Sequence, residues 1–246
     1  MNVDTDVKLV GMKLVEIPYL LEELSEQNED SNILIVGERT GSEGILGAVL
    51  ERSFRSCVCT DIVSIGKDSI LDKVIQNDNR VSFVEQDFVN SDNDQRYDYV
   101  ICANVLEHFG MCFADTYGFS GEYVDDDYIR WNHDLRAIEK MVDLLEQHDA
   151  SKIIITVPSG PPMLYGDIDY STNNLPFLRR YDIHRIKLID SLVKSKGMKL
   201  ENRFFYSKNF NDWQETDISI TQPEYMGYQN PHSPNVLWAF TIKHEI

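Results

Sequence analysis

Apolar residues are grouped along this chain in two alternating patterns. Short, mostly apolar runs, each ended by glycine or polar residues, predict β-strands at 32–37, 57–63, 81–84, 99–103, 152–158, 199–207 and 235–243. Apolar residues at helical spacing predict helices at 17–27, 45–50, 68–75, 135–145 and 186–197. Ser42 is the expected N-cap of the second helix.

This alternation predicts an α/β fold. Strands and helices that alternate at this spacing are typical of a doubly wound, mostly parallel sheet with helices on both faces, here with seven strands. The chain shows no internal repeat and no linker, so we expect one domain over residues 1–246. Within it we expect an N-terminal helical segment over 1–30 and two irregular insertions, at 110–133 and 159–181.

The charge of the chain narrows its possible partners. With 23 lysines and arginines against 41 aspartates and glutamates, the formal net charge is −18. Such a surface repels phosphate backbones, so nucleic acid and anionic membranes are not expected partners. One local basic cluster stands out against this background, formed by Arg179, Arg180, His184, Arg185 and Lys187.

Cysteine usage and hydropathy both predict a cytoplasmic protein. The four cysteines have no zinc-ligand spacing and are expected to be buried free thiols in a reducing compartment: Cys57, Cys59, Cys102 and Cys112. The N-terminus lacks the basic start and apolar core of a secretory signal. No apolar run approaches the roughly 20 residues that a membrane-spanning helix needs.

Polar groups follow four of the predicted strands in succession, and this order is the strongest functional signal. The first strand runs into the loop 37–41, and the second ends at Asp61. The third is followed by Asp87 and Phe88, and the fourth by the segment 104–108. The carboxyl ends of parallel strands form the ligand-binding edge of an open α/β sheet. A glycine turn lets backbone N–H groups approach a ligand carboxylate or phosphate, and an acid after the second strand suits ribose hydroxyls.

The segment 97–109, which reads YDYVICANVLEHF, resembles the fourth-strand motif of class I S-adenosylmethionine-dependent methyltransferases. The order of strand ends extends this resemblance over roughly residues 30–245. The resemblance implies S-adenosyl-L-methionine as cofactor and a small-molecule acceptor. It assigns the methionine part of the cofactor to Gly37, Glu38, Thr40 and Gly41, and the ribose to Asp61 and Ile62. It assigns the adenine to Asp87 and Phe88, and the sulfonium to Asn104, Val105 and Leu106.

Two positions depart from the family pattern. Arg39 stands where the family usually has glycine, and Ile35 stands where it usually has an acid that contacts the amino end of the cofactor. Glu38 is a candidate to take over part of that role. The alternative is a methyltransferase-like protein that has lost catalysis and serves as a binding or scaffold partner. A nucleotide-dependent oxidoreductase is a weaker alternative, because the loop is not Gly-x-Gly-x-x-Gly.

Transfer of a methyl group to an alcohol needs alignment of the acceptor and a base for its proton. His108 is the first candidate for this base and Glu107 the second; the alternative for His108 is a hydrogen bond to the backbone. The fourth strand lacks the Asn/Asp-Pro-Pro-Tyr/Phe segment of enzymes that methylate planar amines. Thr156 to Gly160 and the tyrosine-rich insertions resemble methyltransferases encoded with bacterial surface-polysaccharide genes, which favours a sugar or glycan hydroxyl.

The acidic run 125–127 is the one sequence feature that could bind a divalent cation. Acidic runs are more often solvated than metal-bound, so no metal site is predicted. The aromatic residues of the insertions are expected either to line the acceptor pocket or to pack as a lid: Tyr117, Tyr123, Trp131, Tyr165 and Tyr170.

Overall fold

A computed structural model of the chain describes residues 11–41, 44–110, 132–160, 164–166, 176–209, 211–221 and 236–245, with the side chains of 164–166 and 176–178 left out. The strands are β1 (Asn32–Val36), β2 (Ser56–Asp61), β3 (Val81–Glu85), β4 (Tyr99–Ala103), β5 (Lys152–Pro158), β6 (Leu164–Gly166), β7 (Pro176–Arg179), β8 (Met198–Tyr206), β9 (Gln214–Thr216) and β10 (Val236–His244). The helices are α1 (Lys13–Glu23), α2 (Ile45–Leu50), α3 (Ile70–Asn77), α4 (His133–Asp143) and α5 (Ile183–Ser195), and the 3₁₀ turns are η1 (Leu24–Glu26), η2 (Leu106–His108) and η3 (Ile218–Thr221).

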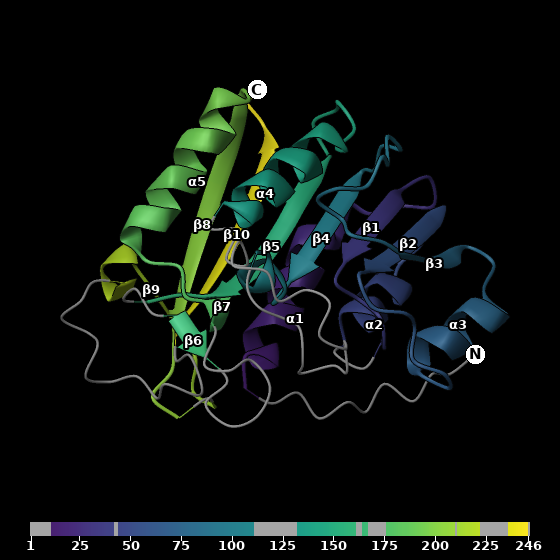
Figure 1. Ribbon diagram of the computed structural model, residues 1–246, viewed down its shortest axis with the longest axis horizontal. Coiled ribbons are helices and arrows are strands. Elements are labelled where there is room, and N and C mark those ends of the chain that lie inside the picture. Colours follow the sequence, from purple (N-terminus) through teal and green to yellow (C-terminus); the bar gives the residue numbers. More distant parts are fainter. Residues whose placement is uncertain are drawn as a thin grey trace.

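The main sheet has the order β3-β2-β1-β4-β5-β10-β8-β9 (Figure 1). Strands β1 to β5 run parallel to one another, whereas β10 is antiparallel to both β5 and β8. The predicted doubly wound α/β sheet is confirmed, but the predicted count of seven strands is wrong, because β9 adds an eighth. This strand is short and polar, and its residues carry no alternating apolar pattern that would have revealed it.

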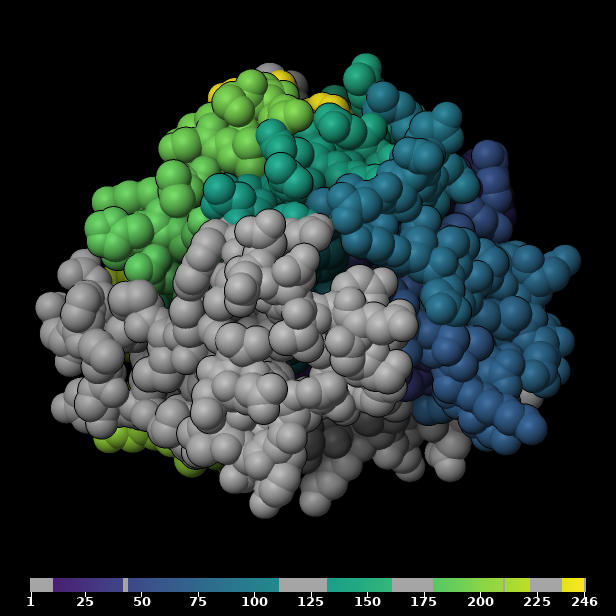
Figure 2. Space-filling model, viewed as in Figure 1, coloured from purple at the N-terminus to yellow at the C-terminus, as the bar shows by residue number. Residues whose placement is uncertain are grey.

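The helices cover both faces of this sheet. On one face, α4 and α5 pack against β4, β5, β8 and β10 around the buried Trp238 and Phe240. On the other, α1 and α2 pack against β1, β2 and β4. Figure 2 shows α5 and α4 together over the upper part of the first face. The core therefore lies in two layers, one on each side of the sheet, as a doubly wound arrangement requires.

The helix boundaries follow local sequence signals. Ser69 accepts a hydrogen bond from the Asp72 N–H and so caps α3, and Asp182 caps α5 through the Arg185 N–H. The second helix, α2, begins directly after Gly44, which has a left-handed backbone. The predicted cap Ser42 lies outside the described residues. Cys57, Cys59 and Cys102 are buried free thiols, as predicted, and Cys112 lies outside the described residues.

Candidate functional site

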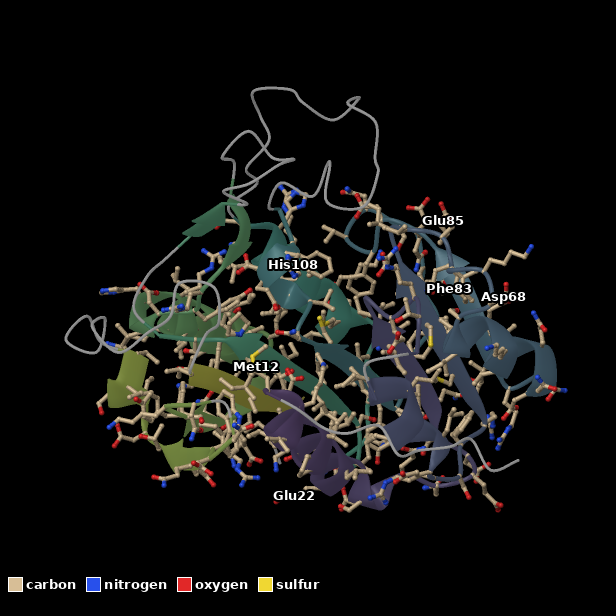
Figure 3. All side chains as sticks on the ribbon, turned by 90° about the horizontal axis from the view of Figure 1, so that it is seen from below. Met12, Glu22, Asp68, Phe83, Glu85 and His108 are labelled. Atoms are coloured by element: carbon tan, nitrogen blue, oxygen red, sulfur yellow. The ribbon has the colours of Figure 1, made fainter. Side chains whose placement is uncertain are left out.

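The ends of β1 and β4 form the point where the strand order reverses. The chain continues from β1 to β2 on one side, and β4 pairs with β1 on the other. In open α/β sheets the crevice beyond such a point is where ligands bind. Figure 3 looks onto this edge of the sheet, with His108 near its middle, Met12 at the start of α1 on one side, and Asp68 and Glu85 at the far end.

Gly37 and Val105 lie against each other at this point. Gly37 follows β1 with a φ of +81°, and its N–H donates to the Thr60 carbonyl at 2.7 Å. A Cβ placed on Gly37 would come within 2.4 Å of both methyl carbons of Val105. Only glycine fits this approach, because both the left-handed backbone and the space exclude a side chain. Two predicted cofactor residues from different strands are thus brought into contact.

Glu38 turns back into the loop that follows Gly37. It is buried, and its carboxylate accepts hydrogen bonds from the N–H groups of Thr40 at 3.1 Å and Gly41 at 2.7 Å. Gly41 also has a positive φ and lies close to the first turn of α3. The loop is therefore held by its own carboxylate. These two N–H groups face Glu38, which differs from the expectation that the loop N–H groups face a ligand carboxylate. Ile35, where the family pattern has an acid, is buried in the core.

Asp61 lies at the end of β2, beside the loop. Its carboxylate accepts the Val63 N–H at 2.9 Å, which fixes its orientation in a tight turn. Burial raises the pKa of Asp61 above its usual value, while the Val63 N–H and the positive charge of Arg39 lower it. The next residue, Ile62, is 52% exposed. A half-buried carboxylate and an exposed apolar side chain stand together at the expected ribose position.

The third strand end differs from its prediction. Asp87 forms a local turn, in which its carboxylate accepts the N–H groups of Val89 and Asn90 and the Asn90 side-chain amide. Phe88 is only 4% exposed, and its ring packs edge-on against Phe109 with centroids 6.2 Å apart. Phe88 therefore belongs to the core under this edge and offers little surface as the predicted wall for adenine. At the neighbouring strand end, the apolar side chain of Ile62 is exposed.

Three separate contacts hold η2, the turn that carries His108. Asn104 enters it with a φ of +57°, and its N–H donates to the Thr156 carbonyl on β5 at 2.8 Å. The Tyr181 hydroxyl donates to the Leu106 carbonyl at 3.1 Å, and Arg179 donates to the Phe109 carbonyl at 2.7 Å. His108 itself is half-buried. These contacts place its ring on a rigid turn, which a positioned general base requires.

Glu107 and Leu106 point into the protein. Glu107 is 2% exposed, and its negative charge adds to burial in raising the pKa of both Cys102 and Tyr181, two fully buried groups. Leu106 is completely buried. Glu107 therefore lies in the interior, within electrostatic reach of Cys102 and Tyr181. Of the two predicted catalytic residues, His108 is the less buried.

Sequence reasoning missed a buried ionic cluster behind η2. Asp134, in the first turn of α4, is fully buried and lies 3.0 Å from a guanidinium nitrogen of Arg179. Arg185 of α5 binds the same carboxylate through two nitrogens. The basic residues were visible in the sequence, but their common partner was not, because it lies 51 residues from Arg185 and looks like an ordinary acid at a helix start.

Several predicted features fall outside the described part of the chain. They include Tyr117, Tyr123, Trp131, Tyr170, the acidic run 125–127 and the side chain of Tyr165. Among the residues that are described, no group of three or more His, Cys, Asp or Glu side chains could hold a metal ion. None of the described helices combines the length and apolarity needed to cross a bilayer.

Comparison with known proteins finds similarity in structure only. No protein-family model matches the sequence, and no curated protein matches it. One similar solved structure is the Burkholderia thailandensis 1,6-didemethyltoxoflavin-N1-methyltransferase with S-adenosylhomocysteine, at TM-score 0.58 and 13% identity over 94% of this chain and 79% of that one. A second is an S-adenosylmethionine-dependent methyltransferase from Clostridium acetobutylicum, at TM-score 0.52 and 9% identity, covering 94% and 91%.

A third similar structure is a proposed RNA methyltransferase from Pyrococcus horikoshii, at TM-score 0.53 and 10% identity over 94% of this chain and 84% of that one. These likenesses show that the chain has the fold of the class I S-adenosylmethionine-dependent methyltransferases. The methyl acceptors of these proteins differ, so the fold does not choose among acceptors. The site residues must do so.

Proposed function

We propose that this protein is an S-adenosylmethionine-dependent methyltransferase that acts on a small polar acceptor. The contact between Gly37 and Val105 carries the proposal, because it joins the ends of β1 and β4 at the reversal point and leaves no room for a side chain on Gly37. Asp61 lies at the end of the neighbouring strand β2, where a carboxylate could accept hydrogen bonds from the ribose hydroxyls of the cofactor. The fold adds support, since similar structures contain S-adenosylhomocysteine.

Four of the residues present fit such a cofactor. Asp61 would accept hydrogen bonds from the ribose hydroxyls, and Ile62 would cover an apolar ring surface. Gly37, packed against Val105, would set the tight turn that leads from β1 into the loop beside the ligand. Glu38 holds the loop through Thr40 and Gly41 and adds negative charge near the end expected to carry an amino group. When bound, the cofactor supplies an electrophilic methyl group.

His108 would act on the acceptor side of the same crevice. An alcohol becomes a competent nucleophile when its proton is removed as the new bond forms, and histidine titrates in the range that suits this task. The rigid turn η2 would hold the ring in one place while the acceptor aligns. A sugar or glycan hydroxyl is the acceptor that we favour, on the resemblance of the Thr156–Gly160 segment and the insertions to polysaccharide-linked methyltransferases.

A second function, a binding protein without catalysis, is favoured by two observations. Glu38 already engages the N–H groups of Thr40 and Gly41, and Arg39 places a positive charge beside Asp61. Arg39 stands where the family pattern usually has glycine. Glu38 lies further along the chain than the acid of that pattern, which would stand at Ile35. If they block the crevice, the fold remains but the cofactor does not bind.

Calorimetric titration separates these functions. The dialysed full-length protein is titrated in parallel with S-adenosylmethionine, S-adenosylhomocysteine and NAD. Micromolar binding of the first two, without binding of NAD, is expected if the crevice is a methyltransferase site. Absence of binding by a chain that circular dichroism shows to be folded would reject the enzyme and support the binding protein. Binding of NAD alone would support an oxidoreductase.

Replacement of His108 tests the proposed base. His108→Ala is expected to lower the rate of S-adenosylhomocysteine formation with a sugar acceptor about 100-fold, because a positioned base contributes roughly that factor or more. Cofactor affinity should change little. His148→Ala is a matched control, since this histidine binds Asp98 at 2.6 Å and lies outside the proposed site. An equal rate in the His108 variant and the control would exclude His108 as the base.

A further inference from the structure

Among the described residues, strand β8 has a neighbouring strand on one side only over most of its length. β10 pairs with β8 along its whole length, from Met198 to Tyr206. β9 lies on the other side and pairs only with the last three residues, from Phe204 to Tyr206. Every second residue of a strand directs its N–H and C=O away from a given neighbour. Positions 198–203 therefore present an outer edge with which a further strand could pair.

A hollow with a volume of about 520 Å³ lies between α5 and β8, which run side by side (Figure 1). Its lining includes three consecutive residues of β8, namely Met198, Lys199 and Leu200. Neighbours along a strand point to opposite faces, so the hollow reaches the edge of the strand itself. Ile186 and Met198 are buried and form an apolar floor, whereas Ile218 of η3 is 36% exposed. The volume is that of a small ligand site, which is enough for an apolar side chain of a partner.

The same flank of the molecule is basic, although the chain as a whole is acidic. Residues 183–199 contain five lysines and arginines and one acid, whereas the whole chain has a formal net charge of −18. Three of these lysines line the hollow: Lys187, Lys194 and Lys199. Charges act over a Debye length of about 8 Å at physiological ionic strength, so these lysines outweigh more distant acids for a ligand bound beside them.

The ion pairs that the lysines make are at the surface. Lys194 pairs with Asp190 at 2.7 Å and Lys199 with Glu201 at 2.8 Å, and all four side chains are partly exposed. Exposed pairs of this kind are weak, so the carboxylates of a partner can replace Asp190 and Glu201 at little cost. Glu245 is the other acid that lines the hollow. The flank therefore favours a ligand that carries several carboxylates.

Asn202 connects the hollow to the core of the protein. It lines the hollow, and its side-chain oxygen accepts a hydrogen bond at 2.9 Å from the indole N–H of Trp238, which is fully buried. A ligand that reaches Asn202 changes the polar surroundings of this indole. Tryptophan emission is therefore a direct readout of whether the hollow is occupied.

We propose that this flank binds an acidic protein segment in extended form, which adds a strand to the outer edge of β8. One apolar side chain of the segment enters the hollow, and acidic side chains beside it contact the lysines. Strand addition supplies main-chain hydrogen bonds, and a pocket for alternate side chains supplies specificity. A peptide suits the site better than a nucleic acid, because a strand edge and an apolar floor match no phosphate backbone.

This site is separate from the crevice at the ends of β1 and β4. β8 is antiparallel to β10, which is antiparallel to β5, so β8 runs in the direction of β5. Its first residues, Met198 to Leu200, therefore lie at the amino ends of the parallel strands, opposite the crevice. The inference does not depend on methyl transfer, and a partner bound here leaves the crevice open.

Binding of defined peptides tests the inference. Labelled heptapeptides that alternate glutamate or aspartate with leucine, valine or phenylalanine are titrated with the full-length protein, and fluorescence anisotropy is measured. Each peptide has three counterparts, with lysine for the acids, with serine for the apolar residues, or with alternate amides N-methylated so that strand pairing is blocked. We expect at least one acidic peptide to bind about 10-fold or more tightly than all three.

Two further readouts belong to the same titration. The affinity of the acidic peptide should fall as salt rises, because its charges lie at the surface. Tryptophan emission should change along the same curve when the peptide is unlabelled. The inference is overturned if no acidic peptide binds more tightly than its lysine counterpart, or if the N-methylated form binds equally well. Tighter binding of an eight-nucleotide oligothymidylate would also overturn it and identify a nucleic-acid surface.

Variants assign the binding to the hollow. Lys187→Gln combined with Lys199→Gln should lower the affinity for the acidic peptide about 10-fold, and Ile218→Asp should lower it at least as far. Lys73→Gln is the matched control, because this exposed lysine lies on α3 at the other end of the sheet (Figure 1). All these positions are exposed, so the melting temperatures should stay close to that of the parent chain. Parental affinity in both hollow variants would overturn the inference.

Discussion

The two halves of the ligand-binding edge are built in different ways. At the ends of β1 and β2, the backbone shapes the site: Gly37 and the loop after it turn tightly, and Asp61 is a partly buried carboxylate at the second strand end. At the ends of β4 and β5, buried side chains shape it, with Asp134 and its arginines behind η2. The first half needs local turns. The second needs charges from three separate elements, so its geometry depends on the tertiary fold being complete.

Breaking the ionic cluster should have the largest effect. Asp134→Ala leaves Arg179 and Arg185 without their shared carboxylate, and loss of one partner of a buried ion pair costs about 3–5 kcal/mol of unfolding free energy. Urea unfolding measures this loss. Asp190→Ala is the control, because it removes a surface pair with Lys194 that contributes only about 0–1 kcal/mol. Equal losses in the two variants would show that the cluster does not support this half of the edge.

Filling the space at Gly37 tests the half that the backbone shapes. Gly37→Ala should cost about 2–4 kcal/mol, which combines the left-handed backbone with the clash against Val105. Gly197→Ala isolates the first of these, since Gly197 has a φ of +70° and no atom within 4 Å of an added Cβ. Its cost should be about 1–2 kcal/mol.

A second substitution sharpens that result. Val105→Ala in the Gly37→Ala background should recover part of the lost stability, since it removes the methyl groups that the new Cβ would meet. Denaturant unfolding of the four chains completes a double-mutant cycle. Strict additivity of the two changes would mean that the contact across the reversal point is not energetically significant.

Asp61 should show the smallest effect on stability and a clear effect on binding. Burial raises its folded-state pKa, so the folded chain binds more protons than the unfolded chain between the two pKa values, and stability contributed by Asp61 falls as pH rises through that window. Asp61→Asn cannot titrate. It should therefore gain stability relative to the parent chain across that window, by less than about 1 kcal/mol, and keep the gain above it.

The same variant should bind the cofactor less tightly, by roughly 10-fold or more, because an amide accepts hydroxyl hydrogen bonds more weakly than a carboxylate. Thermal unfolding over a pH series and calorimetry measure the two effects. Asp30→Asn, at an exposed position, should change neither. If Asp61→Asn lost stability at neutral pH, or bound the cofactor unchanged, the assignment of Asp61 as a desolvated ligand group would be wrong.

Much of the sheet could be predicted because its signals are local. Strand β5 begins and ends where its apolar run does, and α3 and α5 begin beside a serine and an aspartate that cap them. Strand β9 could not be predicted, because three polar residues form a strand only where an open edge of β8 offers hydrogen bonds. The burial of Phe88 could not be predicted for a related reason, since the sequence shows that a residue is apolar but not whether its ring packs into the core or lines a ligand site.

Local patterns in the chain are enough to predict the order of the main elements and the strand ends that meet at one edge: the loop after Gly37, Asp61, Asp87 and the segment 104–108. Apolar periodicity and parallel connections are enough for this, because both act within about 30 residues of chain. The direction in which each of these side chains points depends on the complete fold. In the folded chain, Glu38 accepts hydrogen bonds from its own loop and Glu107 is buried. Arg179 and Arg185 share the carboxylate of Asp134. Such contacts depend on desolvation and on partners from distant segments, which no local pattern records.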